Sequence, residues 1–377
     1  MDPTPQTLLI VAGEESGDMR AASLVREIAA LCPGTRFVGI GGNRCREAGV
    51  ATFTDITELA VIGFTEVIRN FARIKRVFDL TLERARTERP VLAILVDYPG
   101  FNLRLARELK KHGIKVIYYI SPQVWAWKES RVAIVKSNVD RMMVLFPFEK
   151  DLYDRHGYTA DLVGHPLVDE VHADITRHEF LSHAGLDPHA PVIALLPGSR
   201  AKEISRHLPV MLAAASLMRQ KRPDIQFILL KAKNLDQACF SPWLHLAPEK
   251  LKITEDYYNA LGSCNSAVVC SGTATLETAL MGKPMVVVYK TSWLTWHLGK
   301  FLVKIPYIAL VNIVAGKKIV EELLQANASP AHLAAEALKT LFPSDKLLQE
   351  LVRVKQLLGS PGASRRAALI VREELDR

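Results

Sequence analysis

The sequence predicts an α/β protein of two domains, each a parallel sheet covered by helices. The chain has 377 residues, and a domain usually takes roughly 100–200, so two domains are expected. Short apolar runs typical of buried strands alternate with longer amphipathic stretches typical of helices, which indicates βαβ units. The alternation is interrupted once, at residues 165–191, and then restarts. This interruption predicts a linker between two similar halves.

In the first half, residues 8–13 form an apolar run that ends in a glycine and leads into a helical pattern at 19–31. Apolar runs of the same kind recur along this half and predict its further strands. Helical patterns lie between them. The further predicted strands are 36–42, 91–97, 115–121 and 141–146, with helices at 66–86 and 102–112.

The second half repeats this order. Its predicted strands are 192–199, 225–230, 251–254, 266–272 and 284–290, with a helix at 203–221 and another that ends near 281. The tail, 345–377, is helical by pattern. We therefore expect a domain at 1–185, on which the tail 343–377 packs, and a second domain at 186–342. Two Rossmann-like halves facing a cleft match the GT-B arrangement of glycosyltransferases, in which the last helix often crosses back to the first domain; this is an analogy of fold.

Composition limits the function classes. Hydrophobic residues make up 49% of the chain and charged residues 23%, which suits two folded cores. The net charge of +8 calls for an anionic partner, either lipid or a phosphorylated ligand, and nucleic acid is disfavoured because no basic block or aromatic-basic motif occurs. Five cysteines without a CxxC pair indicate a reducing cytoplasm. The N-terminus does not resemble a signal peptide, and no apolar run approaches the ~20 residues of a membrane span.

Two strand ends in the second half suggest phosphate binding. In the first, Pro197 stops a strand, Gly198 and Ser199 form a tight turn, and a helix begins near Glu203. Backbone N–H groups at a helix start attract phosphate, and Arg200 can add a bidentate contact. The alternative is a plain turn with a surface arginine.

The second strand end is the turn Ser271-Gly272-Thr273, directly before another helix. Glu277 lies four residues past Thr273, where its carboxylate could accept both hydroxyls of a ribose. A capping box with Ser or Thr at the cap explains the same pattern equally well. The chain contains no DxD pair, so we expect neither metal nor cofactor, and phosphate charge has to be met by helix ends and Arg or Lys.

In the first half, Asp97 stands at the tip of a predicted strand, before a rigid Pro-Gly turn. A carboxylate there suits a general base, and a helix cap is the equal alternative. The loop after the first strand carries Ser16, Gly17 and Asp18, which could lie near a ligand; in isolation Asp18 fits a helix cap better. The loop after residue 121 carries Gln123, Trp125 and Trp127, which suggests either sugar or acyl contact or an interface anchor.

Residues 61–78 form a basic amphipathic pattern. Phe64, Ile68 and Phe71 recur at helical spacing, with Arg69 and Arg73 on other faces. The commoner meaning of such a pattern is a helix packed on a sheet. With the positive net charge, docking on anionic lipid is the functional alternative.

Ten motifs occur in order between residues 12 and 325. They are AGEESGD, FVGIGG, ELAVIGFTEVI, VDYPGFN, YYISPQVWAWK, LFPFEK, VGHPL, LLPGSRAKEI, SGTATLE and VNIVAGKKIVEELLQ. With these motifs the chain closely resembles the lipid A disaccharide synthase family of lipopolysaccharide biosynthesis. The resemblance covers nearly the whole chain.

The resemblance implies an inverting, metal-independent GT-B glycosyltransferase. The donor would be UDP-2,3-diacylglucosamine and the acceptor the 6-hydroxyl of 2,3-diacylglucosamine 1-phosphate, giving a β-1,6 disaccharide 1-phosphate and UDP. Asp97 matches the family's proposed base, Asn312 an asparagine near the nucleotide, and 61–78 a region tied to the cytoplasmic face of the inner membrane. The donor-binding set would be Gly198, Ser199, Arg200, Glu203, Ser271, Gly272, Thr273, Glu277 and Asn312.

Two positions depart from the family pattern. Cys45 replaces the usual Met, and Val311 the Pro expected before Asn312. The tail helices fit either their own first domain or a neighbour's, which would make a swapped homodimer. The alternatives are another UDP-sugar glycosyltransferase with a lipid acceptor, a UDP-sugar epimerase, or a membrane-docked nucleotide-sugar sensor without activity.

Overall fold

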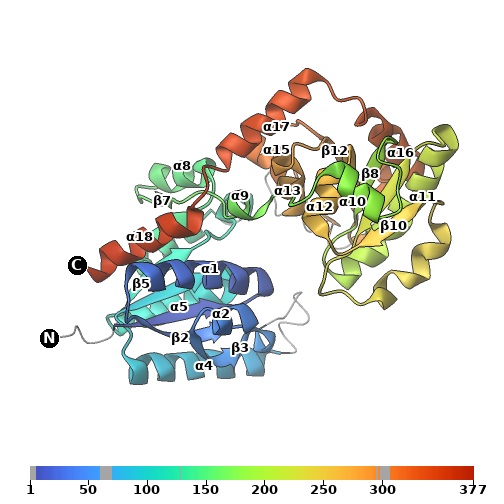
Figure 1. The fold of residues 1–377 in the computed structure, drawn as a ribbon. Helices are drawn as coiled ribbons and strands as arrows, with labels where there is room; N and C mark the ends of the chain where they lie inside the picture. The colour runs from blue at the N-terminus through green and yellow to red at the C-terminus, as the bar shows by residue number, and fades with distance from the viewer. Residues whose placement is uncertain (1–5, 60–69, 128, 294–295, 298–305) are drawn as a thin grey trace. The chain divides into compact units, whose positions relative to one another are not determined.

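Two parallel β-sheets organise the chain, one of seven strands and one of six. The computed structural model describes residues 6–59, 70–127, 129–293, 296–297 and 306–377. The chain divides into two compact units (Figure 1). The first ends at Pro166 and resumes at Gly359, and the second runs from Leu167 to Leu358.

The sheet of the first unit has the order β3-β2-β1-β4-β5-β6-β7. Its central strands are buried on both faces, as a sheet covered by helices on both sides requires. The strands are β1 Thr7–Ala12, β2 Arg36–Gly41, β3 Val50–Asp55, β4 Leu92–Val96, β5 Lys115–Tyr119, β6 Arg141–Val144 and β7 Asp161–Leu162.

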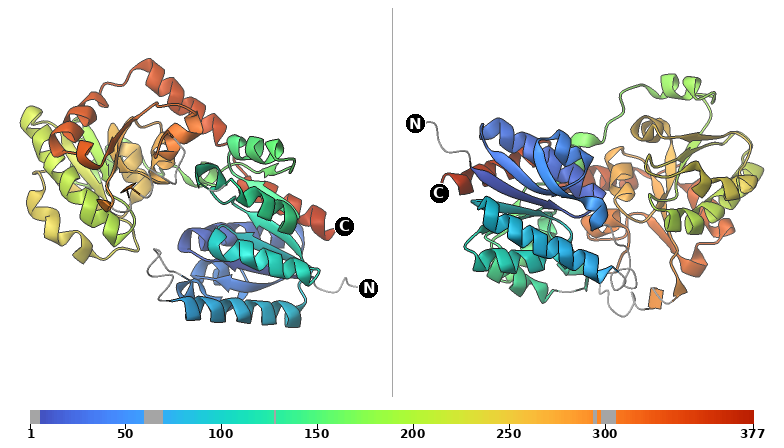
Figure 2. Two further views of the ribbon diagram at one scale, coloured as in Figure 1. Left: turned by 180° about the vertical axis from the view of Figure 1, so that it is seen from behind. Right: turned by 90° about the horizontal axis from the view of Figure 1, so that it is seen from below.

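Helices lie on both faces of this sheet (Figures 1 and 2). On one face α1 packs against the last helix of the chain, α18, and on the other α5 packs between α4 and α7. The helices are α1 Glu15–Leu31, α2 Asn43–Glu47, α4 Phe71–Glu88, α5 Pro99–Lys111, α6 Val124–Trp127, α7 Arg131–Asn138, α8 Pro147–Arg155 and α18 Ala363–Leu375, with a 3-10 turn at Ile56–Glu58.

The second unit repeats the plan with the order β10-β9-β8-β11-β12-β13. Helices α11 and α16 pack together over one core, and α13, α15 and α17 contact one another. The strands are β8 Val192–Leu196, β9 Gln226–Leu230, β10 Leu251–Thr254, β11 Ser266–Cys270, β12 Met285–Tyr289 and β13 Glu321–Leu324. The helices are α9 Leu167–Glu170, α10 Arg177–His183, α11 Ala201–Lys221, α12 Tyr257–Ser263, α13 Ala274–Leu280, α15 Leu310–Ala315, α16 Pro330–Lys339 and α17 Asp345–Leu357, with 3-10 turns at Gln237–Cys239, Ser241–Leu246 and Gln325–Asn327.

The predicted class of fold is confirmed, but the division of the chain differs from the expected one. The first crossing between units falls after residue 166 and not after 185, and the tail does not pack as one body on the first unit. Helix α17 stays with the second unit, because its buried Leu351 and Val354 lie on a helix that contacts α13 and α15. Only 359–377 returns to the first unit.

Each sheet has one place where strand order reverses. In the first unit, β1 lies between β2 and β4, and the strands before and after this point follow one another in opposite directions across the sheet. In the second unit, β8 lies between β9 and β11 in the same way. Open α/β sheets bind ligands outside the carboxyl ends of the strands at such switch points. The loops to inspect are therefore those after β1 and β4 and those after β8 and β11.

Within the described residues, no helix is both long enough and apolar enough to cross a bilayer.

Candidate active site

Asp97 follows β4 in a conformation that side-chain-bearing residues seldom adopt. Both Asp97 and Tyr98 have positive φ, at 47° and 48°. The strain is held by hydrogen bonds to the Asp97 carbonyl, which accepts from the Tyr118 hydroxyl at 2.5 Å and from the Asn102 amide at 2.8 Å. Strained backbone that the surroundings hold in this way concentrates at functional sites. It turns Asp97 out of the strand direction at the switch point.

The Asp97 carboxyl is less acidic than usual. Burial raises its pKa to about 6, the negative charge of Glu14 adds to the increase, and a hydrogen bond from the Tyr98 N–H opposes it. Glu14 follows β1, the strand that pairs with β4, so two carboxylates face the same switch point. A carboxyl group that titrates near 6 is still ionised at neutral pH and is a better proton acceptor than an ordinary aspartate.

The rest of the loop after β1 is mainly structural. Asp18 is buried, and its carboxylate accepts hydrogen bonds from the backbone N–H groups of Gly42, Arg44 and Cys45 at 2.6, 3.1 and 3.2 Å. It therefore caps α2, the helix after the neighbouring strand β2, and not its own helix. Ser16 is exposed and Gly17 is buried.

The loop after β5 is anchored by a buried carboxylate. Trp125 donates its indole N–H to Glu149 at 3.2 Å and packs edge-on against Phe148. The other Glu149 oxygen accepts from the backbone N–H groups of Leu145 and Phe146, directly before α8, and burial raises the Glu149 pKa to about 7. Gln123 is exposed, and the Trp127 side chain lies outside the described residues. The described contacts anchor Trp125 and leave its role towards a sugar as a prediction.

In the second unit, the turn after β8 depends on Gly198. Its φ is +125°, and a Cβ there would lie 2.5 Å from the Glu203 carboxylate. Glu203 folds back to accept the Ser199 N–H at 2.9 Å and pairs with Arg200 at 3.1 Å. Because Arg200 is 54% exposed and a guanidinium has five donors, it keeps N–H groups for an anion.

The turn after β11 is tied to a more distant segment. The Ser271 hydroxyl donates to the Ile308 carbonyl at 3.0 Å, and Gly272 has a φ of +148°. Thr273 precedes α13 but makes no side-chain capping hydrogen bond. This removes the capping box as an explanation of the Ser-Gly-Thr sequence.

The Glu277 carboxylate is held by two tyrosine hydroxyls. Its carboxylate accepts hydrogen bonds from the Tyr257 hydroxyl at 3.1 Å and the Tyr258 hydroxyl at 3.0 Å. Both tyrosines stand at the start of α12. They orient a half-buried carboxylate near the Ser271–Thr273 turn, an arrangement that suits the recognition of hydroxyl groups.

Asn312 uses all of its amide hydrogen-bonding groups inside the protein. Its oxygen accepts from the Ile319 and Val320 N–H groups, and its nitrogen donates to the Val320 carbonyl and to Glu322. Glu322 in turn accepts the Ile308 N–H at 2.9 Å. Asn312 therefore braces the segment that receives the Ser271 hydroxyl.

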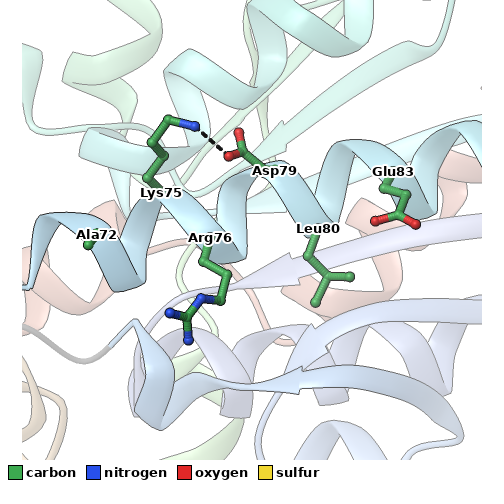
Figure 3. A pocket seen from close by; sticks show the side chains of 6 residues that line it. All are labelled: Ala72, Lys75, Arg76, Asp79, Leu80 and Glu83. Atoms are coloured by element: carbon green, nitrogen blue, oxygen red, sulfur yellow. Dashed lines mark hydrogen bonds and ion pairs between the residues drawn. The ribbon is translucent and has the colours of Figure 1, made fainter.

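The predicted membrane-facing residues are only partly described. Phe64, Ile68 and Arg69 lie outside the described residues. Phe71 begins α4 and is 57% exposed. Arg73 does not point fully outward, because its Nε is buried, and this atom has no hydrogen-bond partner among the residues that the structure describes. The outer face of α4 forms an open surface pocket with an ion pair between Lys75 and Asp79 (Figure 3), lined by Ala72, Lys75, Arg76, Asp79, Leu80 and Glu83.

Several residues at these sites were missed from the sequence. Glu14 stands within a motif already singled out, and a carboxylate directly after a strand was a usable signal. Tyr257 and Tyr258 lie about 20 residues before Glu277, and nothing local links them to it. Glu149 and Glu322 stand within the motifs LFPFEK and VNIVAGKKIVEELLQ, and the position of Glu149 three residues after Phe146 is the local signal of a capping box.

Comparison with known proteins identifies the fold and the family of this chain. Solved structures with the same fold include a putative UDP-N-acetylglucosamine 2-epimerase from Listeria monocytogenes, 15% identical, with a TM-score of 0.66 over 99% of this chain and 97% of that one. The calicheamicin glycosyltransferase, also 15% identical, has a TM-score of 0.62 over 100% of this chain and 99% of that one. The chain thus has the GT-B class of fold, two Rossmann-like units with the last helix returning to the first.

The sequence relatives are more specific. The family model described as lipid-A-disaccharide synthetase matches residues 8–369. Lipid-A-disaccharide synthase of Geobacter sulfurreducens is 45% identical, over 99% of this chain and 98% of that protein, and that of Nitrosococcus oceani is 42% identical, over 98% and 96%. The chain belongs to the lipid-A-disaccharide synthase family and is a glycosyltransferase.

Proposed function

We propose that this chain transfers 2,3-diacylglucosamine from UDP-2,3-diacylglucosamine to the 6-hydroxyl of 2,3-diacylglucosamine 1-phosphate. Asp97 takes the proton of the 6-hydroxyl. The oxygen attacks the anomeric carbon from the face opposite UDP, the bond from that carbon to the diphosphate breaks, and UDP leaves with the electron pair. The configuration inverts, which gives the β-1,6-linked disaccharide 1-phosphate.

The observation that carries this proposal is the strained, weakly acidic Asp97 at a switch point in a chain of this family. A pKa of about 6 suits a base that is ionised at neutral pH. In the other unit, the positive end of α11 and the exposed Arg200 guanidinium before it offer positive charge to a leaving diphosphate, while the Ser199 N–H is bonded to Glu203. Glu277, held by two tyrosine hydroxyls, suits the ribose.

Replacing the base tests the proposal. Asp97→Asn keeps the shape of the side chain and removes its ability to accept a proton, so kcat should fall by about 100- to 10,000-fold. The measurement is mass analysis of the disaccharide product and release of UDP, with both lipid substrates present. A thermal unfolding curve checks that the variant is folded.

Turnover of Asp97→Asn at the wild-type rate would remove Asp97 as the base. If the enzyme formed product from UDP-N-acetylglucosamine, which has no acyl chains, its substrates would be water-soluble sugars and not the proposed lipids. The low-identity likeness to epimerase structures shows the fold alone and does not favour that reaction.

We further propose that the chain docks on the cytoplasmic face of the inner membrane through the start of α4. Phe71 is exposed there, and exposed Lys75 and Arg76 follow on the same helix. Substrates with acyl chains reside in a membrane, so a docked enzyme meets them without extracting them into water.

A further inference from the structure

One buried histidine joins two loops of the second unit. His207 lies in α11, on the buried side of the helix, and has no exposed surface. Its Nδ1 lies 3.0 Å from the carbonyl oxygen of Pro197, and its Nε2 accepts the backbone N–H of Lys290 at 2.9 Å. Pro197 directly precedes Gly198, and Lys290 directly follows β12. One imidazole ring therefore connects the segment after β8 with the segment after β12.

The two partners determine the protonation of the ring. A carbonyl can only accept, so Nδ1 carries the proton, and a backbone N–H can only donate, so Nε2 does not. Burial lowers the pKa of His207, which keeps the ring neutral. Both nitrogens are thus used by backbone groups, and neither remains for a reaction.

The connected segments flank the turn that carries Ser271. Strand β11, which ends at that turn, lies between β8 and β12 in the sheet. The segment after β12 is held on its other side as well, because Gln325 accepts the Thr291 N–H at 3.0 Å and donates to the Thr291 carbonyl at 3.3 Å. The carboxyl ends of β8, β12 and β13 are therefore tied together by two side chains.

We propose that His207 is a positioning residue for donor binding. It fixes the Pro197–Arg200 turn against the segment at 290–291, so that Arg200 and the start of α11 keep the position that a nucleoside diphosphate requires. The inference rests on the proposed function for the class of donor. A histidine that only fills the core would contribute to stability and would not affect the two substrates differently.

Three substitutions separate the two hydrogen bonds. His207→Gln keeps an acceptor at the position of Nε2 and loses the bond to Pro197. His207→Asn keeps a donor at the position of Nδ1 and loses the bond to Lys290. His207→Leu loses both. The matched control is Met211→Ala, one turn further along the buried face of α11, which removes core packing from the same helix and leaves both His207 hydrogen bonds in place.

The measurements are UDP affinity by calorimetry on the full chain and steady-state kinetics with both substrates. His207→Leu should weaken UDP binding and raise the donor KM by about tenfold or more, equivalent to the loss of one or two hydrogen bonds. The acceptor KM should stay within about twofold of the wild type. The His207→Gln and His207→Asn variants should each keep part of the UDP affinity that His207→Leu loses, because each variant keeps one of the two hydrogen bonds.

The inference is overturned if the folded Gln and Asn variants bind UDP as tightly as the wild type. It is equally overturned if Met211→Ala weakens UDP binding as much as His207→Leu does, or if the KM values of donor and acceptor rise together. A wild-type chain that binds no UDP would overturn both this inference and the proposed function. Wild-type UDP binding with unchanged affinity in the His207 variants would overturn this inference alone.

Discussion

The basicity of Asp97 depends on where β4 ends and on a second carboxylate, Glu14, at the end of β1. Burial is the larger cause of the raised pKa, and the charge of Glu14 adds to it. A base must be ionised to accept a proton, so below its pKa of about 6 the rate should fall about tenfold per pH unit. Removing the charge of Glu14 stabilises the ionised form of Asp97 and lowers this pKa.

Glu14→Gln should therefore move the acid limb of log kcat/KM to lower pH. The limb is measured between about pH 4.5 and 8 with both lipid substrates. Glu15→Gln removes the same charge from the next residue, the first of α1, and should leave the limb in place. An equal shift in both variants, or a shift to higher pH, would contradict the assignment of Glu14 as the neighbour that tunes the base.

At this scale the sequence predicts the residue types but not their partners. The sequence predicts Asp97 as either base or cap. Its positive φ is held by Tyr118 and Asn102, and its pKa is raised by burial and then by Glu14, and these surroundings come together only in the folded sheet. His207 gave a weak signal, a histidine in an apolar helical stripe. Its two backbone partners are 10 and 83 residues away, and sequence spacing cannot pair them.

Helix α4 is mainly an ordinary packed helix, one of the two meanings that its amphipathic pattern allows. Val77, Thr81 and Ala85 recur every four residues and are buried, so most of the helix packs on the sheet in the ordinary way. At its first turn Phe71 stays exposed. The expected helix at 66–86 was right in kind, while α4 runs from 71 to 88 and residues 60–69 lie outside the described part of the chain.

If this first turn docks on lipid, Phe71→Ser combined with Arg76→Glu should weaken binding to vesicles by at least about tenfold. The aromatic ring loses its apolar burial, and a basic residue near an anionic surface contributes about 1 kcal/mol. Flotation with vesicles of phosphatidylglycerol and phosphatidylethanolamine measures the effect. The control is Val352→Ser with Arg353→Glu on α17, where Val352 is 58% exposed. Equal flotation of both double variants would rule out α4 as the docking element.

At the scale of the whole molecule, the chain completes its first unit only with its last residues. Helix α18 packs on α1, and Glu374 near its end is buried. That carboxylate pairs with Lys115 of β5 at 3.3 Å and with Arg141 of β6 at 3.1 Å. The sequence predicted a helical tail that returns to the first unit, but its amphipathic pattern could not separate α17 from α18. Their apolar faces look alike, and the difference lies in which unit offers the complementary surface.

Glu374 and its neighbour Glu373 provide a matched test of how α18 is held on the first unit. Both pair with Arg141, but the Glu374 side chain is 6% exposed and the Glu373 side chain 58%. Glu374→Ala removes the largely buried carboxylate that Lys115, Arg141 and Arg377 share, and we expect the free energy of unfolding of the first unit to fall by about 2–3 kcal/mol. Glu373→Ala removes a solvated pair and should cost less than about 0.5 kcal/mol. Calorimetric unfolding of the full chain measures both, and equal effects would mean that α18 is not held through Glu374. Because α18 belongs to the first unit alone, the transition of the second unit should stay unchanged in either variant.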